Sequence, residues 1–502
     1  MSLSIIHTRI PIGVHAQPVT VEVHLANGLP SFQIVGLPEK AVQESRERVR
    51  SAITNSQLEF PQRRITVNLA PADIPKEGGG FDLPIAMGIL QASAQIPENS
   101  LDDMEFIGEL ALSGNIRAVK GILPIAIGCQ QENKTLFFPA GNENEVSLVS
   151  KIKALPVEHL LELTAHFNSN NKLATITPNP NQQSGFSHYP CMSDIKGQPQ
   201  AKRALLIAAS GNHSMLMIGP PGSGKSMLAQ RLPGIIPPLS EKQALETAAV
   251  HSISHLQFDS NNWLQPPFRA PHHSASAAAL VGGGSIPKPG EISLAHNGVL
   301  FLDELTEFNR HTLDVLREPL ENGFISLSRV AQKTRFPSRF QLVAAMNPCP
   351  CGYLGDLKRA CGTCTFEQIK RYQGKVSGPV LDRIDIHIEV PAVPASVLSS
   401  NTAPEENSET VRERVKQTRQ IQLDRQGVTN SQLDNKQIKQ HAELKPDGQK
   451  LIQEAIDKLG LSARAYHRIL RVSRTIADLA ESKQIEKLHV AEAINYRKLD
   501  RQ

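Results

Sequence analysis

Apolar residues follow two different spacings along the first third of the chain. Residues 19–24 and 64–69 carry β-branched and apolar side chains in runs or in alternation, which predicts strands. Residues 39–56 instead repeat their apolar positions at helical spacing, and residues 83–94 are a second candidate for a helix. This mixture of strands and helices over residues 1–167 predicts a domain of the α/β or α+β class.

Two polar stretches divide the rest of the chain. Residues 168–190 are rich in Asn, Gln, Ser and Pro, a composition that buries too little to fold and therefore predicts a linker. Residues 191–394 alternate apolar strands with helices, which predicts an α/β core. Beyond a second polar stretch at 399–408, residues 409–502 show helical spacing only, and Ser462 is placed to cap the clearest helix.

Composition excludes some classes of protein. The 502 residues carry a formal net charge of +4, but residues 411–502 hold 19 Lys and Arg against 12 Asp and Glu. Such a basic segment either attracts polyanions or is a solvated helical surface. No apolar run reaches the roughly 18 residues of a membrane span, and residues 1–13 lack the apolar stretch of a secretory signal. We therefore expect a cytoplasmic protein without a membrane partner.

A glycine-rich loop follows the apolar run at residues 215–218 and precedes a helical segment. It reads G-x-x-x-x-G-K-S, with Gly219, Pro220, Pro221, Gly222, Ser223, Gly224, Lys225 and Ser226. The glycines let backbone N–H groups turn toward phosphate oxygens, and the start of a helix adds its positive dipole end. Lys225 is expected to reach the β- and γ-phosphates of ATP, and the Ser226 hydroxyl is expected to bind Mg²⁺.

Polar side chains follow two further strands of the predicted core. Residues 299–302 are apolar and lead into Asp303 and Glu304, 78 residues after the lysine of the loop. Two acids at the end of a buried strand favour a catalytic edge, where Asp303 holds Mg²⁺ and Glu304 accepts a proton from the attacking water. Asn347 follows the strand predicted at residues 341–345, and it either orients that water or serves as a turn residue before a proline.

These motifs resemble those of AAA+ ATPases, with the glycine-rich loop as Walker A, the Asp-Glu pair as Walker B and Asn347 as sensor 1. Residues 282–298 resemble the helix-2 insert shared by magnesium-chelatase motors and MCM helicases. The segments R-A-P-H-H-S at 269–274 and S-G-P-V-L-D-R-I-D at 377–385 are similar to the ComM (YifB) branch of magnesium-chelatase-like proteins. The resemblance covers nearly the whole chain. The two adjacent histidines are more typical of structural than of catalytic roles.

The resemblance implies a homo-hexameric DNA helicase that drives branch migration during natural transformation, with an AAA+ αβα core and a helical C-terminal lid. The arginine finger of such rings, which reaches the ATP of a neighbouring subunit, corresponds to Arg383. An ion pair of Arg383 with Asp382 or Asp385 is the alternative. Sensor 2 corresponds to Arg464, at the predicted start of a helix. Arg317 could face a neighbour's site or pair with a nearby glutamate, and this choice stays open.

Basic side chains gather in three places that are candidates for DNA contact. In the family that this chain resembles, the stretch between residues 327 and 350 is the pre-sensor-1 hairpin, which points into the ring pore. That stretch has no acid and carries Arg329, Lys333, Arg335 and Arg339. Lys288 lies in the insert, and Lys358 and Arg359 lie among the cysteines described next. Such cations neutralise the phosphates of single-stranded or branched DNA without reading its sequence, whereas the alternative is a solvated surface.

Four of the six cysteines form a cluster just after the sensor asparagine. Cys349, Cys351, Cys361 and Cys364 give the spacing C-x-C-x₉-C-x₂-C, and the glycines between them permit tight turns. Four thiolates at this spacing suit a tetrahedral Zn²⁺ site, whose binding energy would order a loop that lacks a core of its own. Free thiols and a regulatory disulfide are the alternatives.

The N-terminal domain resembles the Lon protease domain over residues 71–83 and 114–121, but it lacks the nucleophile. Gly80 stands where Lon has its catalytic serine, and glycine has no side chain for nucleophilic attack. The position of Lon's catalytic lysine falls near Leu123 rather than on Lys120. We therefore expect a Lon-like fold without peptidase activity, which forms a structural or DNA-engaging tier of the ring.

Three other functions compete with that of a DNA translocase or helicase. A magnesium-chelatase motor subunit uses the same ATPase core to insert metal into a porphyrin, but it needs neither a Lon-like domain nor a cysteine cluster. Gly80 argues against an ATP-dependent protease, and the intact Lys225, Asp303 and Glu304 argue against a non-catalytic scaffold. The DNA motor is the leading hypothesis, and the chelatase motor is the alternative.

Overall fold

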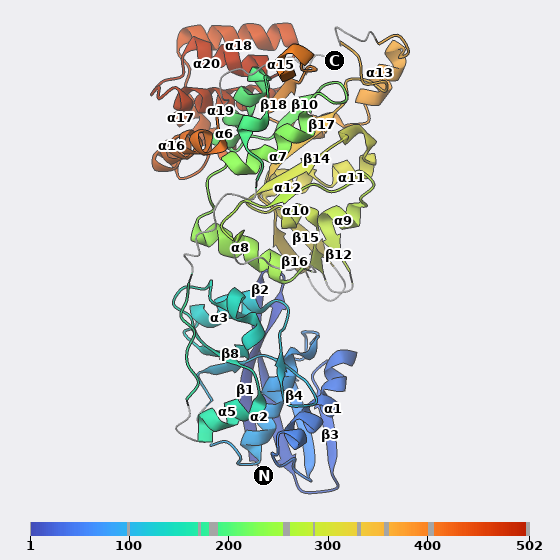
Figure 1. The fold of residues 1–502 in the computed structure, drawn as a ribbon, viewed down its shortest axis with the longest axis vertical. Helices are drawn as coiled ribbons and strands as arrows, with labels where there is room; N and C mark the ends of the chain where they lie inside the picture. Colours follow the sequence, from blue (N-terminus) through green and yellow to red (C-terminus); the bar gives the residue numbers. More distant parts are fainter. Residues whose placement is uncertain are drawn as a thin grey trace. The chain divides into compact units, whose positions relative to one another are not determined.

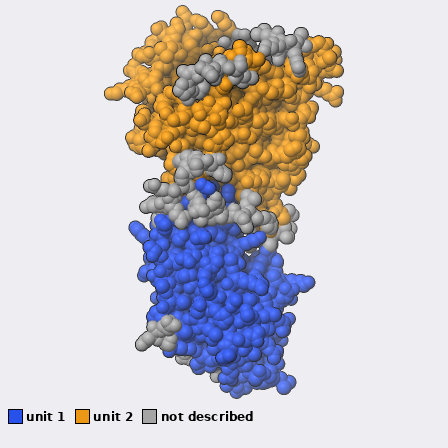
Figure 2. Space-filling model, in the orientation of Figure 1, with its two compact units in different colours: residues 1–183, 245–263 blue, residues 184–244, 264–502 orange. Residues whose placement is uncertain are grey.

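The structure, a computed structural model, describes residues 2–97, 101–168, 172–179, 189–254, 262–284, 287–328, 333–355, 361–399 and 406–497. The chain forms two compact units (Figure 2). Unit 1 contains residues 1–183 and 245–263, and unit 2 contains residues 184–244 and 264–502. Within the described ranges, every helix is too short or too polar to cross a bilayer.

Unit 1 is built on a seven-stranded mixed sheet with the order β3-β4-β2-β1-β5-β8-β9. The strands are β1 (Ser2–Ile12), β2 (His15–Ala26), β3 (Ser31–Val35), β4 (Arg64–Ala70), β5 (Met104–Phe106), β8 (Thr135–Pro139) and β9 (Lys153–Val157), with β6 (Glu109–Leu110) and β7 (Ile116–Arg117) as a small separate pair. β1 and β2 form a long antiparallel hairpin, whereas β1, β5, β8 and β9 run parallel. β2 and β4 confirm the strands predicted at residues 19–24 and 64–69.

Helices pack with this sheet in two apolar clusters. The helices are α1 (Lys40–Asn55), α2 (Asp82–Ala92), α3 (Ile122–Gln131), α4 (Glu143–Val146) and α5 (Leu160–Asn168). α1 and α2, which confirm the two helices predicted at residues 39–56 and 83–94, share one cluster with β1, β2 and β4. α3 packs with β8 in the other cluster. α2 is buried along nearly its whole length, so its sequence is apolar on all sides rather than along one stripe.

Two further segments pack in unit 1. Within the predicted linker, Ile176 is buried and its N–H donates to the carbonyl oxygen of Ala154 in β9. Ile176, the partly buried Leu173 and main-chain hydrogen bonds order the described part of this stretch, and its polar composition did not reveal them. Helix α8 (Glu241–Ser252) begins in unit 2, but residues 245–263 belong to unit 1, where Ala248 is buried beside α3.

Unit 2 contains a five-stranded, all-parallel sheet with the order β11-β14-β17-β10-β18. The strands are β10 (Met215–Ile218), β11 (Phe268–Arg269), β14 (Val299–Leu302), β17 (Gln341–Met346) and β18 (Ile386–Glu389). β14 and β17 are buried at every residue, as central parallel strands covered on both faces are. Parallel strands present their carboxyl ends at one edge, so the residues that follow β10, β14 and β17 meet there. The predicted α/β core is confirmed.

Helices and two hairpins surround this sheet. The helices are α6 (Pro199–Gly211), α7 (Lys225–Ile235), α9 (Ala277–Val281), α10 (Glu291–Leu294), α11 (Arg310–Asp314), α12 (Arg317–Asn322), α13 (Phe366–Gln373), α14 (Gly378–Leu381) and α15 (Ala395–Ser399). One antiparallel hairpin pairs β12 (Gly282–Gly283) with β13 (Lys288–Pro289), within the stretch that resembles the helix-2 insert. The other pairs β15 (Phe324–Ser328) with β16 (Lys333–Pro337), where the pre-sensor-1 hairpin was expected.

The C-terminal part of unit 2 is helical, as predicted, and forms the orange-to-red cluster in Figure 1. Its helices are α16 (Ser408–Gln426), α17 (Asn435–His441), α18 (Pro446–Leu459), α19 (Ala463–Leu479) and α20 (Lys487–Asn495). Ser462 caps α19, because its hydroxyl accepts a hydrogen bond from the N–H of Ala465. Ile469 and Ile476 on the predicted apolar face are buried, and they share a core with α6, α7 and the sheet.

Candidate nucleotide site and cysteine cluster

The glycine-rich loop connects β10 to α7, and its glycines are required by the backbone. Gly222 and Gly224 adopt left-handed backbone angles, with φ of 75° and 94°. A Cβ atom on Gly219 would stand 2.1 Å from the carbonyl oxygen of Val390. Only glycine tolerates these angles and this close approach at no cost. α7 begins directly at Lys225, so the positive end of its dipole faces the loop.

Polar side chains from the ends of β10, β14 and β17 meet at one edge of the sheet. The Ser226 hydroxyl donates to Asp303 Oδ2 at 2.6 Å. Lys225 Nζ donates to Asn347 Oδ1 at 3.3 Å, and to the carbonyl oxygens of two loop residues at 2.7 and 2.9 Å. Burial lowers the pKa of Lys225, while the charge of Asp303 acts in the opposite direction. The structure thus brings together side chains from three segments that lie far apart in the sequence.

This donor set fits a magnesium–nucleotide complex. The Ser226 hydroxyl and the Asp303 carboxylate are oxygen ligands of the kind that Mg²⁺ takes in nucleotide sites. The Lys225 ammonium, held beside the loop, supplies the positive charge that phosphate oxygens need. Asn347 lies within reach of that ammonium, where a neutral amide can orient water.

Glu304 has a partner that the sequence did not predict. Its backbone is left-handed, with φ of 51°, and its N–H donates to Asp303 Oδ1 at 2.9 Å. One carboxylate oxygen of Glu304 lies 2.9 Å from Nδ1 of His273. The only signal in the sequence was the R-A-P-H-H-S segment, which does not show by itself that its histidine reaches the Walker B glutamate.

Arg383 lies in unit 2 with its guanidinium engaged within its own chain. It pairs with Glu321 of α12 and donates to the carbonyl oxygen of Pro379, and 9% of its side chain is exposed. Asp385, considered above as a partner of Arg383, instead pairs with Arg468 of α19. Arg383 therefore pairs with Glu321, which lies 62 positions earlier in the sequence, and no local pattern predicted this partner.

The other two candidate arginines differ in their surroundings. Arg464 is exposed in the first turn of α19. Arg317 pairs with Asp314 at 2.7 Å and donates to the Ser377 hydroxyl at 3.2 Å. Arg317 therefore pairs with Asp314, three residues before it, and not with the nearby glutamate that the sequence suggested.

Asp385 ties the start of β18 to the C-terminal helices. Its carboxylate contacts Arg468 and lies 3.0 Å from Nδ1 of the buried His213, whose Nε2 lies 2.8 Å from the Thr475 hydroxyl of α19. Burial alone would raise the pKa of Asp385. The charge of Arg468 and the hydrogen bond from His213 outweigh burial and hold this pKa well below its usual range.

The candidate DNA-binding cations lie on or beside the two hairpins. Arg335 is exposed on β16, with its guanidinium 4.9 Å from the ring centroid of Phe324, and Arg339 is exposed just beyond that strand. Lys333 begins β16, and Lys288 is partly buried in β13. The other predicted cations, Arg329, Lys358 and Arg359, lie outside the described residues.

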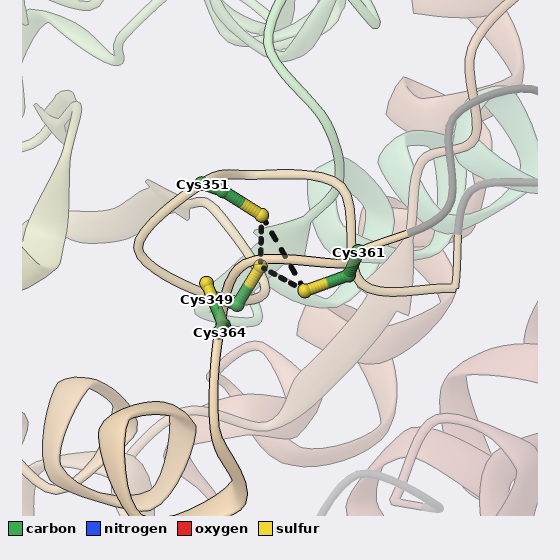
Figure 3. Close-up of side chains that lie close together, drawn as sticks. All are labelled: Cys349, Cys351, Cys361 and Cys364. Carbon is green, nitrogen blue, oxygen red and sulfur yellow. Dashed lines mark hydrogen bonds between the residues drawn. The ribbon is translucent and has the colours of Figure 1, made fainter.

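The four clustered cysteines converge on one point (Figure 3). All four sulfur atoms lie within 4.8 Å of one another, and those of Cys349, Cys351 and Cys361 are separated by 3.3, 3.4 and 3.8 Å. Zinc–thiolate bonds of about 2.3 Å in a tetrahedron place sulfur atoms about 3.8 Å apart, so the cluster fits Zn²⁺. The hydrogen bond from the backbone N–H of Tyr353 is the largest of several contacts that lower the pKa of the Cys351 thiol to about 6, which favours its thiolate, whereas the hydrogen bond with Cys351 is the largest cause of the raised pKa of Cys361.

The cysteine loop also touches the nucleotide site. Gly352 has a left-handed φ of 85°, and a Cβ atom there would lie 2.7 Å from the ring of Pro221 and 3.8 Å from Asn347 Cγ. At the other end of the loop, Gln373 donates to the carbonyl oxygen of Pro348 at 3.0 Å. The loop therefore packs against the glycine-rich loop and against the residue that follows β17.

The residue expected at the position of Lon's catalytic serine, Gly80, carries no nucleophile. Gly80 lies in a short 3₁₀ turn before α2, where a Cβ atom would stand 2.7 Å from the side chain of Ile107. The buried Asp82 nearby is engaged by two hydrogen bonds from Arg48, of 2.6 and 3.0 Å. Leu123, near the position of Lon's lysine, is fully buried. Apolar side chains and an ion pair thus occupy this region.

Comparison with known proteins places the whole chain in one family. Residues 191–398 match the model described as magnesium chelatase, subunit ChlI. Residues 21–142 match that of subunit ChlI of Mg-chelatase, and residues 405–497 match that of magnesium chelatase, subunit ChlI C-terminal.

Full-length relatives narrow this assignment. The chain is 51% identical to competence protein ComM of Haemophilus influenzae, over all of this chain and 98% of the relative. It is 49% identical to the uncharacterized protein YifB of Escherichia coli, with the same coverage. The magnesium-chelatase 38 kDa subunit of Cereibacter sphaeroides is 27% identical over 31% of this chain and 52% of its own length. The chain belongs to the ComM/YifB family of magnesium-chelatase-like AAA+ proteins.

Proposed function

We propose that the chain is an ATP-dependent DNA translocase or helicase, which works as a homo-hexamer and promotes branch migration of recombination intermediates during natural transformation. The observation that carries this proposal is the meeting of Lys225, Ser226, Asp303 and Asn347 at one sheet edge. The name of the relative from Haemophilus influenzae, competence protein ComM, supports the link to transformation. A cytoplasmic location follows from this role.

In this proposal the site hydrolyses ATP. Lys225 and the backbone of the glycine-rich loop bind the phosphates, while Ser226 and Asp303 hold Mg²⁺, which stabilises charge on the phosphate oxygens. Glu304 accepts the proton of the attacking water, and Asn347 orients that water against the γ-phosphate.

The ring completes each site from a second subunit. Arg383 of one subunit stabilises the charge that develops on the ATP of the next, and Arg464 acts as sensor 2 on the lid. For this role, Arg383 exchanges its intramolecular pair with Glu321 for the neighbour's phosphate. Assembly and hydrolysis are therefore coupled through one side chain.

The two hairpins contact DNA. Exposed Arg335 and Arg339, together with Arg329, Lys333 and Lys288, neutralise phosphates, so binding is independent of sequence and falls steeply with salt. Lys358 and Arg359 add charge beside the cysteine loop. The Lon-like N-terminal domain acts without peptidase activity, because Gly80 offers no nucleophile.

The cysteine cluster holds a structural Zn²⁺. Four thiolates leave no open coordination position, which is the property of a structural rather than a catalytic site. Metal analysis of the purified protein should find one zinc per chain, and titration of free thiols should find five fewer reactive cysteines in the native protein than in the unfolded, chelated protein, because the buried Cys129 is protected together with the four ligands. A native protein in which Cys129 alone escapes reaction would reject the site.

Steady-state ATP turnover with and without DNA tests the function. Purified protein should assemble with ATP, and single-stranded or four-way-junction DNA should stimulate its turnover, while a Lys225→Ala variant stays inactive under both conditions. Turnover that is indifferent to DNA but responds to a porphyrin substrate and its partner subunits would favour the magnesium-chelatase alternative. Protein that remains monomeric and consumes no ATP would refute both motors.

A further inference from the structure

Helix α13, which follows the cysteine cluster, stands largely in solvent. Among its residues only Tyr372 is buried, and Ile369 and Gln373 are partly covered. In Figure 1 the helix lies at the margin of unit 2, away from α16–α20. Because most helices in proteins are stabilised by packing one face on the core, a helix that buries so little of itself leaves most of its surface available to a ligand.

The helix is nevertheless held in place at both ends. Thr365 follows Cys364 directly and forms a capping box with Gln368, in which each residue's backbone N–H donates to the other's side-chain oxygen. At the other end, the side-chain amide of Gln373 donates to the carbonyl oxygen of Pro348, the residue that follows the sensor asparagine. The side chains of α13 are therefore presented to solvent from a fixed position.

The first residue of α13 is an exposed aromatic ring. Phe366 is 79% exposed, and of the aromatic side chains that the structure describes, it is the one left in solvent to such an extent. Contact with a ligand would remove this apolar surface from water, which is favourable. The flat face of the ring suits the face of a nucleobase, and such stacking accepts every base because each has a π-face.

Two cations lie beside this ring. Lys370 follows Phe366 by four residues and therefore lies next to it along the helix surface, with Cβ atoms about 5–6 Å apart. Arg371 is the next residue, and both cations are exposed. Glu367 is the one acid of α13, so the helix carries net positive charge. An exposed ring next to positive charge is complementary to a chain of bases linked by phosphates.

We propose that α13 is a contact site for single-stranded DNA, in which one base stacks on Phe366 while Lys370 and Arg371 neutralise adjacent phosphates. The inference rests on the proposed function, which makes DNA the ligand of the motor, and it adds a stacking contact to cations that act on phosphates alone. A base must be unpaired to stack on the ring, so this site discriminates single strands from duplex DNA. The cysteine cluster, whose last member precedes the capping Thr365, then orders a DNA contact as well as the loop beside the nucleotide site.

A tryptophan in place of Phe366 reports on stacking directly. The chain has a single Trp, Trp263, which is 4% exposed, so a ligand-dependent emission of Phe366→Trp comes from the introduced indole. Titration with oligothymidylate, in the presence of a non-hydrolysable ATP analogue, should quench this emission because a stacked base quenches indole fluorescence. The emission of the wild type should stay unchanged. Unquenched emission of Phe366→Trp at saturation would overturn the stacking contact.

Affinity for the same oligonucleotide, measured by fluorescence anisotropy, separates stacking from charge. Phe366→Ala should weaken binding about tenfold, as the loss of one stacked base does, without changing the slope of log affinity against log salt. Phe366→Leu should weaken binding similarly, because leucine is apolar but has no flat ring. Lys370→Ala should instead reduce the steepness of that slope by about 0.7. The matched control Leu488→Ala, which removes an exposed apolar side chain on α20, should change neither quantity.

Other results would overturn the site. Unchanged affinity of Phe366→Ala, beside a wild type that binds the oligonucleotide, would exclude a role of the ring, and equal weakening for single-stranded and duplex DNA would exclude stacking on an unpaired base. If light scattering shows that Phe366→Ala changes the number of subunits without DNA, α13 is a contact between copies of this chain. A wild type that binds no DNA would contradict the proposed function itself, and this site with it. Because Phe366 is exposed, thermal melting of its variants should match that of the wild type.

Discussion

Ser226 donates a hydrogen bond of 2.6 Å to Asp303, and Lys225 donates one of 3.3 Å to Asn347, so two neighbouring residues at the start of α7 each contact a side chain that follows a central strand. The sequence predicted these positions because motif spacing and apolar strands determine which residues end at the same sheet edge. It could not predict that His273 pairs with Glu304. That contact depends on how the insert folds back, and no local pattern records it.

Replacement of the proposed base separates binding from chemistry. A Glu304→Gln variant should bind ATP and assemble like the wild type, but its turnover should fall at least about a hundredfold, because the amide cannot accept the proton. Fluorescent-nucleotide binding and steady-state turnover provide the two measurements. Glu307→Gln, which changes a nearby half-exposed acid, should retain activity. Normal turnover of Glu304→Gln would rule out Glu304 as the base.

Loss of the buried carboxylate at Asp385 should weaken unit 2. Asp385→Asn leaves Arg468 and His213 without their anion, so the free energy of unfolding should fall by about 3 kcal/mol in urea unfolding followed by circular dichroism. The folded pKa of Asp385 lies below its unfolded value, so the carboxylate stabilises the fold above the unfolded value of about 3.9. That stabilisation is lost as the pH falls toward the folded value. Asp382→Asn is the control, and equal losses in both variants would contradict a specific role of Asp385.

Secondary-structure elements were predicted where one apolar pattern dominated. β10, β14 and β17 are short apolar runs in central positions of a parallel sheet, and α19 has a clear apolar face after its Ser462 cap. Elements held by few residues escaped prediction. The stretch around Ile176 is polar in composition, and the packing of Ala248 in unit 1 depends on residues far away in the sequence.

The β15–β16 hairpin should contribute charge but not sequence preference to DNA binding. Replacing Arg335 and Arg339 together by alanine should weaken binding equally for different sequences and reduce the slope of log affinity against log salt by about two. Fluorescence anisotropy with labelled oligonucleotides at several salt concentrations measures both effects. The control is Lys416→Ala, which removes an exposed cation on α16. If the slope of log affinity against log salt is unchanged, this hairpin does not contact DNA phosphates.

The cysteine loop should support the nucleotide site through Gly352, which packs on Pro221. Cys361→Ser should lose the bound zinc and lower ATP turnover about tenfold or more, because a small displacement of the phosphate-binding loop is costly to catalysis. Metal content by mass spectrometry and steady-state turnover test this link. Cys191→Ser, outside the cluster, should change neither. A zinc-free Cys361→Ser protein with full activity would separate the loop from catalysis.

At the scale of the whole molecule, the sequence indicated an N-terminal domain, an AAA+ core and a helical C-terminal part. The structure divides the chain into two units, one of which draws residues 245–263 from the stretch between Walker A and Walker B. Composition could not indicate that residues 245–263 belong to unit 1, because the boundary between the two units at this point lies within α8 and not in a polar linker. The proposed ring and its arginine finger would involve contacts between neighbouring subunits, which the residue pattern of a single chain does not record.

The most direct measurement of the central claim is ATP-dependent movement of a four-way DNA junction. With ATP, the wild-type protein should convert a synthetic mobile junction into its two duplex products, and Lys225→Ala should leave the junction intact while still binding it. Wild-type protein that hydrolyses ATP and binds the junction but does not move its branch point would contradict the account.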